Sequence, residues 1–221
     1  MTNEENLLGI TQILEKQFSY NNYNGFDNSV LPYSLKLGKH NILISAPHAV
    51  NHIRENRVKK ADIYTGTIAS IVQLHTNAFC IYSNRISEED PNYITGGQYK
   101  EAIKGICNQF GIDLILDIHG ADLNREFDID LGTIYGKSIS NGKVDSIKNI
   151  FNNNGINNVK VNEVFSASHP GTITYFSKNS LNVSAIQIEI NRFFRDPNSN
   201  LGAYTSLINS LIDIVNHFKK E

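Results

Sequence analysis

Four short apolar segments rich in β-branched residues constrain the fold more than any other feature of the sequence. They are residues 41–46, 78–82, 113–118 and 183–190. A short, almost continuous apolar run is typical of a strand that is buried on both faces, as in a parallel sheet. Two further strands are predicted at residues 132–135 and 158–161.

The segments between these strands carry apolar residues at helical spacing. This pattern predicts helices over residues 62–75, 98–110, 144–151 and 204–218, after an opening helix over residues 6–18. Strands that alternate with helices form a mostly parallel sheet with helices on both faces. No repeat, linker or boundary interrupts the pattern. We therefore expect an α/β fold in which residues 1–221 form a single domain.

Composition excludes several classes of function. The chain has 221 residues, of which 20 are basic and 22 acidic, and its net charge of -2 does not favour nucleic-acid binding. No run approaches the roughly 18 apolar residues of a membrane span, and the acidic N-terminus is unlike a signal peptide. Cys80 and Cys107 lie in apolar stretches, which favours two buried thiols. We expect a cytoplasmic protein without nucleic-acid or membrane partners.

Polar residues follow the predicted strands at their carboxyl ends, where open α/β sheets bind ligands. His48 follows the first strand and His119 the third, while Glu189 lies near the end of the last. Arg85 follows the second strand, and Arg192 follows the last. In a parallel sheet these side chains converge on one edge. The other histidines, His40, His52, His75 and His217, are expected to be structural or exposed.

Two histidines at neighbouring strand ends favour a metal site, although either one alone would more often be a surface or core residue. Imidazole is the commonest metal ligand, and catalytic zinc often takes two histidines and one carboxylate. Asp62 and Glu55 are the candidates for that carboxylate. Asp62 begins a predicted helix, which gives it a more fixed position, although a carboxylate there also caps the helix. We expect one Zn²⁺ held by His48, Asp62 and His119, with Glu55 in reserve.

Two further acids stand close to these histidines. Asp117 precedes His119 by two residues, so both would project from one face of a strand. Asp117 could then orient a ligand imidazole, or simply end the strand. Glu189 lies inside an apolar strand, where an unpaired charge is costly. It is either paired with Arg192 or a general base.

Three segments together resemble the N-formylglutamate amidohydrolase family and its zinc-carboxypeptidase-like relatives. They are residues 45–49 (Ser-Ala-Pro-His-Ala), 116–120 (Leu-Asp-Ile-His-Gly) and 187–192 (Gln-Ile-Glu-Ile-Asn-Arg), within a resemblance that spans residues 40–195. The resemblance implies a phosphorylase/hydrolase-like fold with three α/β/α layers. It also implies hydrolysis of an amide bond in a small N-acyl acidic amino acid, N-formyl derivatives included, or a related peptide.

The same resemblance implies roles for individual residues. His48 and His119 correspond to zinc ligands, the segment that begins at Asp62 to the third ligand, and Glu189 to the catalytic glutamate. Arg85 and the Asp-Pro-Asn element that ends at Asn92 correspond to a stretch that approaches the substrate.

The sequence also departs from the family. The His-x-x-Glu of the carboxypeptidases is missing, because Asn51 stands three residues after His48. The family's Pro-His-Ser-Gly and Asp-x-His-Ser appear here as residues 47–50 (Pro-His-Ala-Val) and 117–120 (Asp-Ile-His-Gly). These differences line the expected pocket, so they leave open the acyl group and the amino acid.

Four residues are candidates for substrate binding because of their side-chain chemistry or their position in a loop. Arg85, Arg125 and Arg192 could bind a substrate carboxylate or the oxyanion, since a guanidinium binds carboxylates bidentately. Each could instead form a surface ion pair. His169 lies in a loop that either closes over the substrate or is only a connection.

Other classes of function fit less well. No Gly-x-Ser-x-Gly elbow supports a serine hydrolase, and no Gly-x-Gly-x-x-Gly or Gly-Lys-Ser loop supports a nucleotide-binding protein. A non-catalytic metal- or ligand-binding protein with the same fold stays open. The oligomeric state also stays open, a homo-oligomer included.

Overall fold

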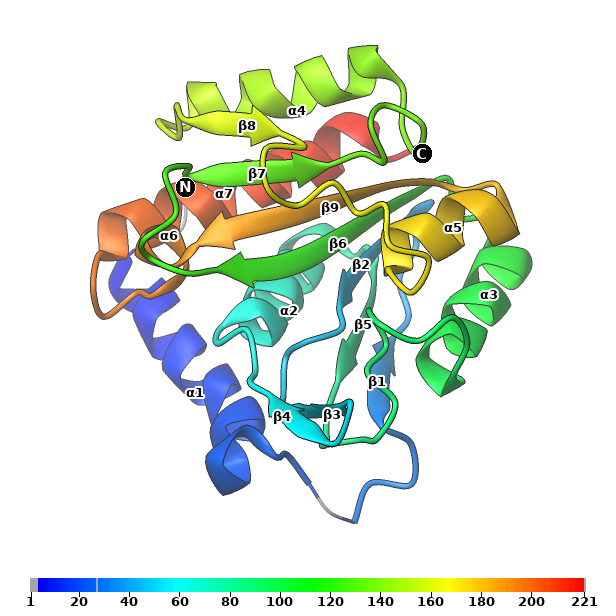
Figure 1. Ribbon diagram of the computed structural model, residues 1–221. Helices are drawn as coiled ribbons and strands as arrows, with labels where there is room; N and C mark the ends of the chain where they lie inside the picture. The colour runs from blue at the N-terminus through cyan, green and yellow to red at the C-terminus, as the bar shows by residue number, and fades with distance from the viewer. Residues whose placement is uncertain (1–3, 27, 221) are drawn as a thin grey trace.

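The computed structural model describes residues 4–26 and 28–220. A seven-stranded sheet crosses the molecule in the order β1-β5-β2-β6-β9-β7-β8 (Figure 1). β5, β2, β6 and β9 run parallel to one another. β1 pairs antiparallel with β5, and β7 pairs antiparallel with β9 but parallel with β8. The strands are β1 (Tyr33–Lys36), β2 (Ile42–Ala46), β5 (Phe79–Ser83), β6 (Leu114–Ala121), β7 (Ile129–Gly132), β8 (Val159–Val161) and β9 (Ser184–Asn191).

Helices cover both faces of this sheet. One buried apolar cluster joins the sheet to α1, α2, α4 and α7, and a second joins the opposite face to α3 and α5. The predicted α/β fold with three layers and a mostly parallel mixed sheet is therefore confirmed. The helices are α1 (Glu4–Tyr23), α2 (Thr65–Thr76), α3 (Gln98–Phe110), α4 (Asn141–Asn153), α5 (Ile173–Leu181), α6 (Arg192–Arg195) and α7 (Leu201–Phe218).

The predicted elements form for the reasons that the sequence pattern suggested. All five residues of β2 are buried, as expected for a central parallel strand. In α7 the buried residues recur every three or four positions, so one stripe of the helix packs on the sheet. The side chain of Asn200 accepts a hydrogen bond from Ala203 N and caps its start.

Two predicted boundaries are wrong. β7 ends at Gly132, and Ile134 and Tyr135 have φ values of 51° and 54°, so the predicted strand over residues 132–135 is largely a turn. Its β-branched residues resemble a strand locally, but the chain leaves the sheet there. Asp62 does not begin a helix, since α2 starts at Thr65 after Tyr64 in a left-handed conformation.

A small hairpin after β2 was not predicted. β3 (His52–Arg54) and β4 (Arg57–Lys59) pair across a two-residue turn. Glu55 and Asn56 in this turn have φ values of 51° and 59°, the geometry of the tight turns that join twisted strands. The hairpin therefore brings basic residues to the carboxyl edge of the sheet.

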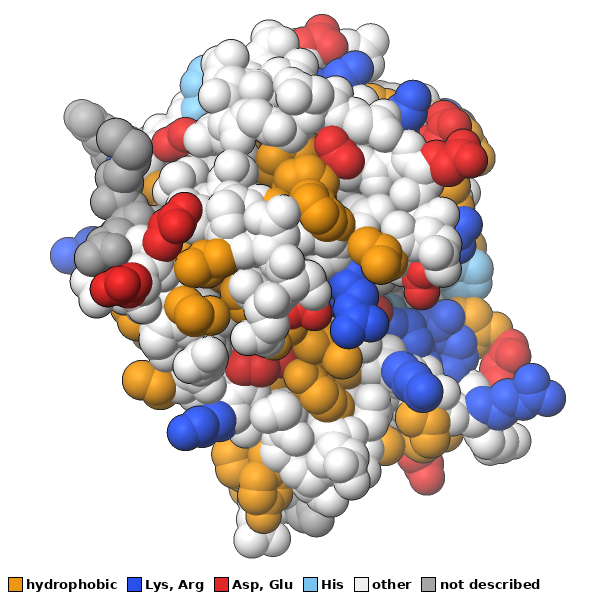
Figure 2. All heavy atoms as spheres, turned by 90° about the vertical axis from the view of Figure 1, so that its left-hand side faces the viewer, with side chains coloured by type: hydrophobic (Ala, Val, Ile, Leu, Met, Phe, Trp, Pro, Cys, Tyr) orange, Lys and Arg blue, Asp and Glu red, His pale blue; other side chains and the backbone are white. Residues whose placement is uncertain are grey.

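Among the described residues, no helix is long enough and apolar enough to cross a membrane. Figure 2 views the side that carries α1, where hydrophobic side chains form small separate groups between polar atoms. Ile10, Ile13 and Tyr20 are the exposed large hydrophobic residues of this helix.

Candidate metal centre

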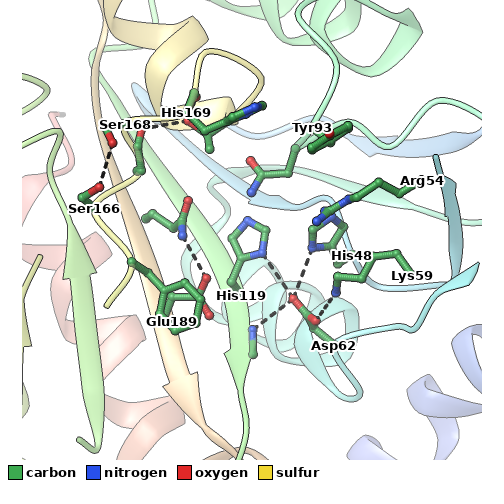
Figure 3. A pocket seen from close by; sticks show the side chains of 16 residues that line it. His48, Arg54, Lys59, Asp62, Tyr93, His119, Ser166, Ser168, His169 and Glu189 are labelled. Atoms are coloured by element: carbon green, nitrogen blue, oxygen red, sulfur yellow. Dashed lines mark hydrogen bonds and ion pairs between the residues drawn. The ribbon is translucent and has the colours of Figure 1, made fainter. Parts of the chain in front are cut away.

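The carboxyl ends of the central strands bring three predicted ligands together. His48 lies two residues beyond the end of β2, and His119 lies within β6 beside Glu189 of β9. Asp62 lies in the turn that precedes α2. His48, Asp62 and His119 are all buried, and their polar atoms point toward one another (Figure 3).

The three side chains have the spacing of a cation site. His119 Nδ1 lies 3.2 Å and His48 Nδ1 lies 3.4 Å from Asp62 Oδ2. In a tetrahedral zinc site with bonds of about 2.0–2.1 Å, ligand atoms lie about 3.3 Å apart. His48 Nδ1 is buried and makes no hydrogen bond within the described residues. The donor set therefore fits a divalent cation, and an orphaned nitrogen faces its position.

A carboxylate lies behind each imidazole. His48 Nε2 is 2.8 Å from Asp90 Oδ1, and His119 Nε2 is 3.3 Å from Asp117 Oδ2. Burial alone would lower the pKa of His119, but Asp117 and then Asp62 raise it to about 10 in the metal-free protein. A carboxylate in this position fixes the tautomer of a ligand imidazole and makes it a better donor. Both Nδ1 atoms are thus left for a cation.

Asp62 is held from several directions. Its N–H donates to His48 O at 2.8 Å, and Gly120 N donates to Asp62 Oδ2 at 3.1 Å. Lys59 Nζ lies 2.6 Å from the other oxygen, Oδ1. Burial alone would raise the pKa of Asp62, but Lys59 and the two imidazoles hold it well below its usual range. The carboxylate is therefore ionised and offers Oδ2.

Glu189 faces the same cavity from β9. Its Oε1 accepts a hydrogen bond of 2.8 Å from Gln187 Nε2. Burial raises the pKa of Glu189 to about 7. Arg192 is not its partner, because that side chain is exposed and lies 3.6 Å from Asp196. A carboxyl group with a pKa near neutrality can both take up and return a proton.

A cavity of about 450 Å³ opens over these residues. Asn92 and His169, both predicted to contact substrate, line it, together with Arg54 and Lys59 of the hairpin. The rings of Tyr93 and His169 stack with centroids 5.2 Å apart, and Arg54 Cζ lies 4.8 Å from the centre of the Tyr93 ring. The cavity lining thus includes an aromatic and basic wall formed by Arg54, Lys59, Tyr93 and His169.

Sequence reasoning missed Arg54, Lys59 and the role of Asp90. The signal for the first two was the group of basic residues within residues 54–60, shortly after His48. The signal for Asp90 was the Asp-Pro-Asn element. The family resemblance implies that this element approaches the substrate, whereas in the structure Asp90 lies behind His48.

The structure does not bring the other predicted residues to the cavity lining. Arg85 donates to the carbonyls of Ser29 and Ile86, away from the site. Arg125 lies over the ring of Phe165, 5.3 Å from its centre, and Arg192 pairs with Asp196.

The remaining side chains lie as follows. Glu55 is exposed in the hairpin turn and accepts from Tyr93 Oη. His52 is buried, 2.8 Å from Pro47 O, and Cys80 and Cys107 are buried free thiols.

The fold is a three-layer α/β arrangement, and the candidate metal centre lies at the carboxyl ends of its parallel strands. No family model matches the sequence, and no curated protein sequence matches it. Solved structures do match. N-formylglutamate amidohydrolase from Ralstonia eutropha JMP134 superposes with a TM-score of 0.63 at 15% identity, over 85% of this chain and 98% of that chain.

Two further structures show the same likeness. A gene product of Agrobacterium tumefaciens gives a TM-score of 0.65 at 10% identity, over 88% of this chain and 96% of that chain. A bacteriophage poly-gamma-glutamate hydrolase gives 0.52 at 14% identity, over 87% and 92%. The fold that the sequence resemblance implied is therefore confirmed.

Proposed function

We propose that this protein is a zinc-dependent amidohydrolase that cleaves the amide bond of a small N-acyl acidic amino acid or a related peptide. One observation carries the proposal. Two imidazole nitrogens and one carboxylate oxygen, from three separate segments, lie within 4.8 Å of one another beside a buried glutamate. Two nitrogen ligands and one oxygen ligand, with space left for water, suit a catalytic zinc ion.

The protein would use its own groups as follows. His48 Nδ1, His119 Nδ1 and Asp62 Oδ2 would hold the cation, which would supply the Lewis acidity that activates water and polarises an acyl carbonyl. Glu189 takes the proton of the attacking water and returns it to the leaving amine. Gln187 binds Oε1 of Glu189, which leaves Oε2 to accept that proton.

The basic wall of the cavity favours an anionic substrate. Arg54 and Lys59 line the cavity, but Lys59 is already bound to Asp62. Arg54 binds Asp90 through Nε and Nη2, but its side chain is 32% exposed, which leaves Nη1 for a substrate carboxylate. Two structural neighbours are described as hydrolases of N-formylglutamate and poly-gamma-glutamate. N-acylglutamates and γ-glutamyl peptides are therefore the first substrates to assay.

The test is a panel of N-formyl, N-acetyl and N-succinyl amino acids, assayed with zinc and with a chelator. We expect turnover of glutamate or aspartate derivatives that the chelator abolishes and zinc restores. Turnover that survives complete removal of metal would contradict the proposal, and so would a zinc-loaded protein that is inactive on the whole panel.

The Glu189→Gln variant tests the general base. It should keep bound zinc but lose about 10²–10⁴-fold in kcat, the range in which general bases contribute. Glu163→Gln, the same change at an exposed site, is the matched control and should retain wild-type turnover. If Glu189→Gln also retains it, another group removes the proton.

A further inference from the structure

Arg195 is a buried cation that the proposed chemistry does not use. Its residue is only 5% exposed, and its guanidinium donates hydrogen bonds to three backbone carbonyls. Nε donates to Ile190 O at 3.2 Å and Nη2 to Ala121 O at 2.9 Å, while Nη1 donates to Ile63 O. The side chain stands at the end of α6 and is not among the residues that line the cavity.

Each of these carbonyls lies one or two residues after a residue of the candidate centre. Ile63 directly follows Asp62, and Ile190 directly follows Glu189. Ala121 lies two residues after His119, at the end of the same strand. Arg195 therefore joins three segments that are far apart in the chain. A guanidinium is planar and presents its donors in a fixed fork, so it sets the relative positions of its acceptors.

Gly120 connects this guanidinium to the metal ligands. A Cβ atom placed on Gly120 would lie 2.5 Å from Arg195 Cζ, so the glycine lets the guanidinium pack against the backbone. The N–H of the same residue donates to Asp62 Oδ2 at 3.1 Å. Gly120 does not have a positive φ. The close approach of Arg195 is thus the physical reason for glycine at this position.

We propose that Arg195 is the positioning residue of the metal centre, and that it holds Asp62, His119 and Glu189 in register through the backbone. This inference rests on the proposed function. The cation needs its ligand atoms at one set of distances and the general base beside it, and the three segments that carry Asp62, His119 and Glu189 have no covalent link near the site. Without Arg195 three buried carbonyls lose their donor, and the segments relax independently of one another.

The experiment compares Arg195→Met, Arg195→Lys and Gly120→Ala with the wild-type protein. The zinc dissociation constant is measured by competition with a chromophoric chelator, and ligand geometry by the visible spectrum of the Co²⁺-loaded protein. Stability of the metal-free protein is measured separately by urea unfolding. Lys104→Met and Gly105→Ala are the matched controls, since Lys104 is exposed and Gly105 has no atom near its added Cβ.

We expect the zinc dissociation constant to rise about 10–100-fold in Arg195→Met and Gly120→Ala, the range seen when groups that orient metal ligands are removed. The Co²⁺ spectrum should change with it. Arg195→Lys keeps the charge but not the planar fork, so its dissociation constant should lie between those of the wild type and Arg195→Met. Both controls should match the wild type.

The result that overturns the inference is a folded Arg195→Met variant with wild-type zinc affinity and a wild-type Co²⁺ spectrum, whatever its stability. If Arg195→Met does not fold, Arg195→Lys decides in its place. Unchanged zinc affinity in that variant would overturn the inference, and weakened affinity would support it. A wild-type protein that binds no zinc would instead overturn the proposed function on which the inference rests.

Discussion

The substitution Asp90→Asn removes the negative charge behind His48 but keeps the size and shape of the side chain. Asp90 is 1% exposed, and both of its oxygens are occupied. Oδ1 lies 2.8 Å from His48 Nε2 and accepts from Asn92 N at 3.0 Å, while Oδ2 lies 2.8 Å and 2.6 Å from Arg54 Nε and Nη2. Burial alone would raise the pKa of Asp90, but His48 and Arg54 hold it well below its usual range.

The size of the effect follows from these contacts. An asparagine keeps one oxygen acceptor but must present its NH₂ group either to Arg54 or to His48, where donors already point. Loss of the carboxylate behind a ligand imidazole lowers metal affinity about 10–100-fold, or about 1.4–2.7 kcal/mol. On the other side, Arg54 is 32% exposed. Water can therefore replace part of the interaction that Arg54 loses with the Asp90 carboxylate. We expect the free energy of unfolding to fall by about 1–3 kcal/mol.

The assay is chelator competition for zinc, with thermal unfolding of the metal-free and zinc-loaded protein beside it. The matched control is Asp145→Asn on the exposed side of α4, which should change neither quantity. A folded Asp90→Asn variant whose zinc dissociation constant lies within twofold of the wild type would refute the reasoning.

Two further predictions concern groups away from the metal. Burial raises the pKa of Glu15 above 4.5, so the folded state binds its proton more tightly than the unfolded state. The unfolding free energy of the wild type relative to Glu15→Gln should therefore fall as pH rises from 4.5 to the raised pKa, by at most about 1.4 kcal/mol per pH unit. Urea unfolding at several pH values would measure this difference in unfolding free energy. A difference that rises with pH over the same range would contradict the prediction. The buried amine of Lys100 donates to the carbonyls of Pro91 and Gly171, in two loops beside the cavity. Lys100→Met should raise KM about tenfold, which corresponds to about 1.4 kcal/mol of substrate binding, without changing zinc affinity. The control Lys104→Met, at an exposed position, should change neither quantity. A KM of Lys100→Met within twofold of the wild type would contradict the prediction.

The sequence was most informative about the central strands. β2, β6 and β9 are apolar, β-branched and buried, so their positions and their shared carboxyl edge could be read from the pattern. This edge places His48, His119 and Glu189 near one another with little help from the loops. The parallel register accounts for the proximity of His48, His119 and Glu189, whereas Asp62 comes from the turn before α2.

The loops could not be predicted in the same way. An arginine just after a strand looks the same in sequence whether it faces a cavity or, like Arg85, a neighbouring loop. Asp90 reaches His48 across 42 positions only because the intervening hairpin and loop fold back. Asp62 was expected on a helix and lies in the turn before it, where Lys59 and backbone contacts fix it instead. Tertiary contacts decide such positions.

The most direct test of the account is anomalous diffraction at the zinc edge from crystals of the zinc-loaded protein. The account predicts one strong peak per chain, about 2.0–2.2 Å from His48 Nδ1, His119 Nδ1 and Asp62 Oδ2. A zinc ion bound through the Nε2 atoms, a peak elsewhere in the molecule, or no peak at saturating zinc would contradict it.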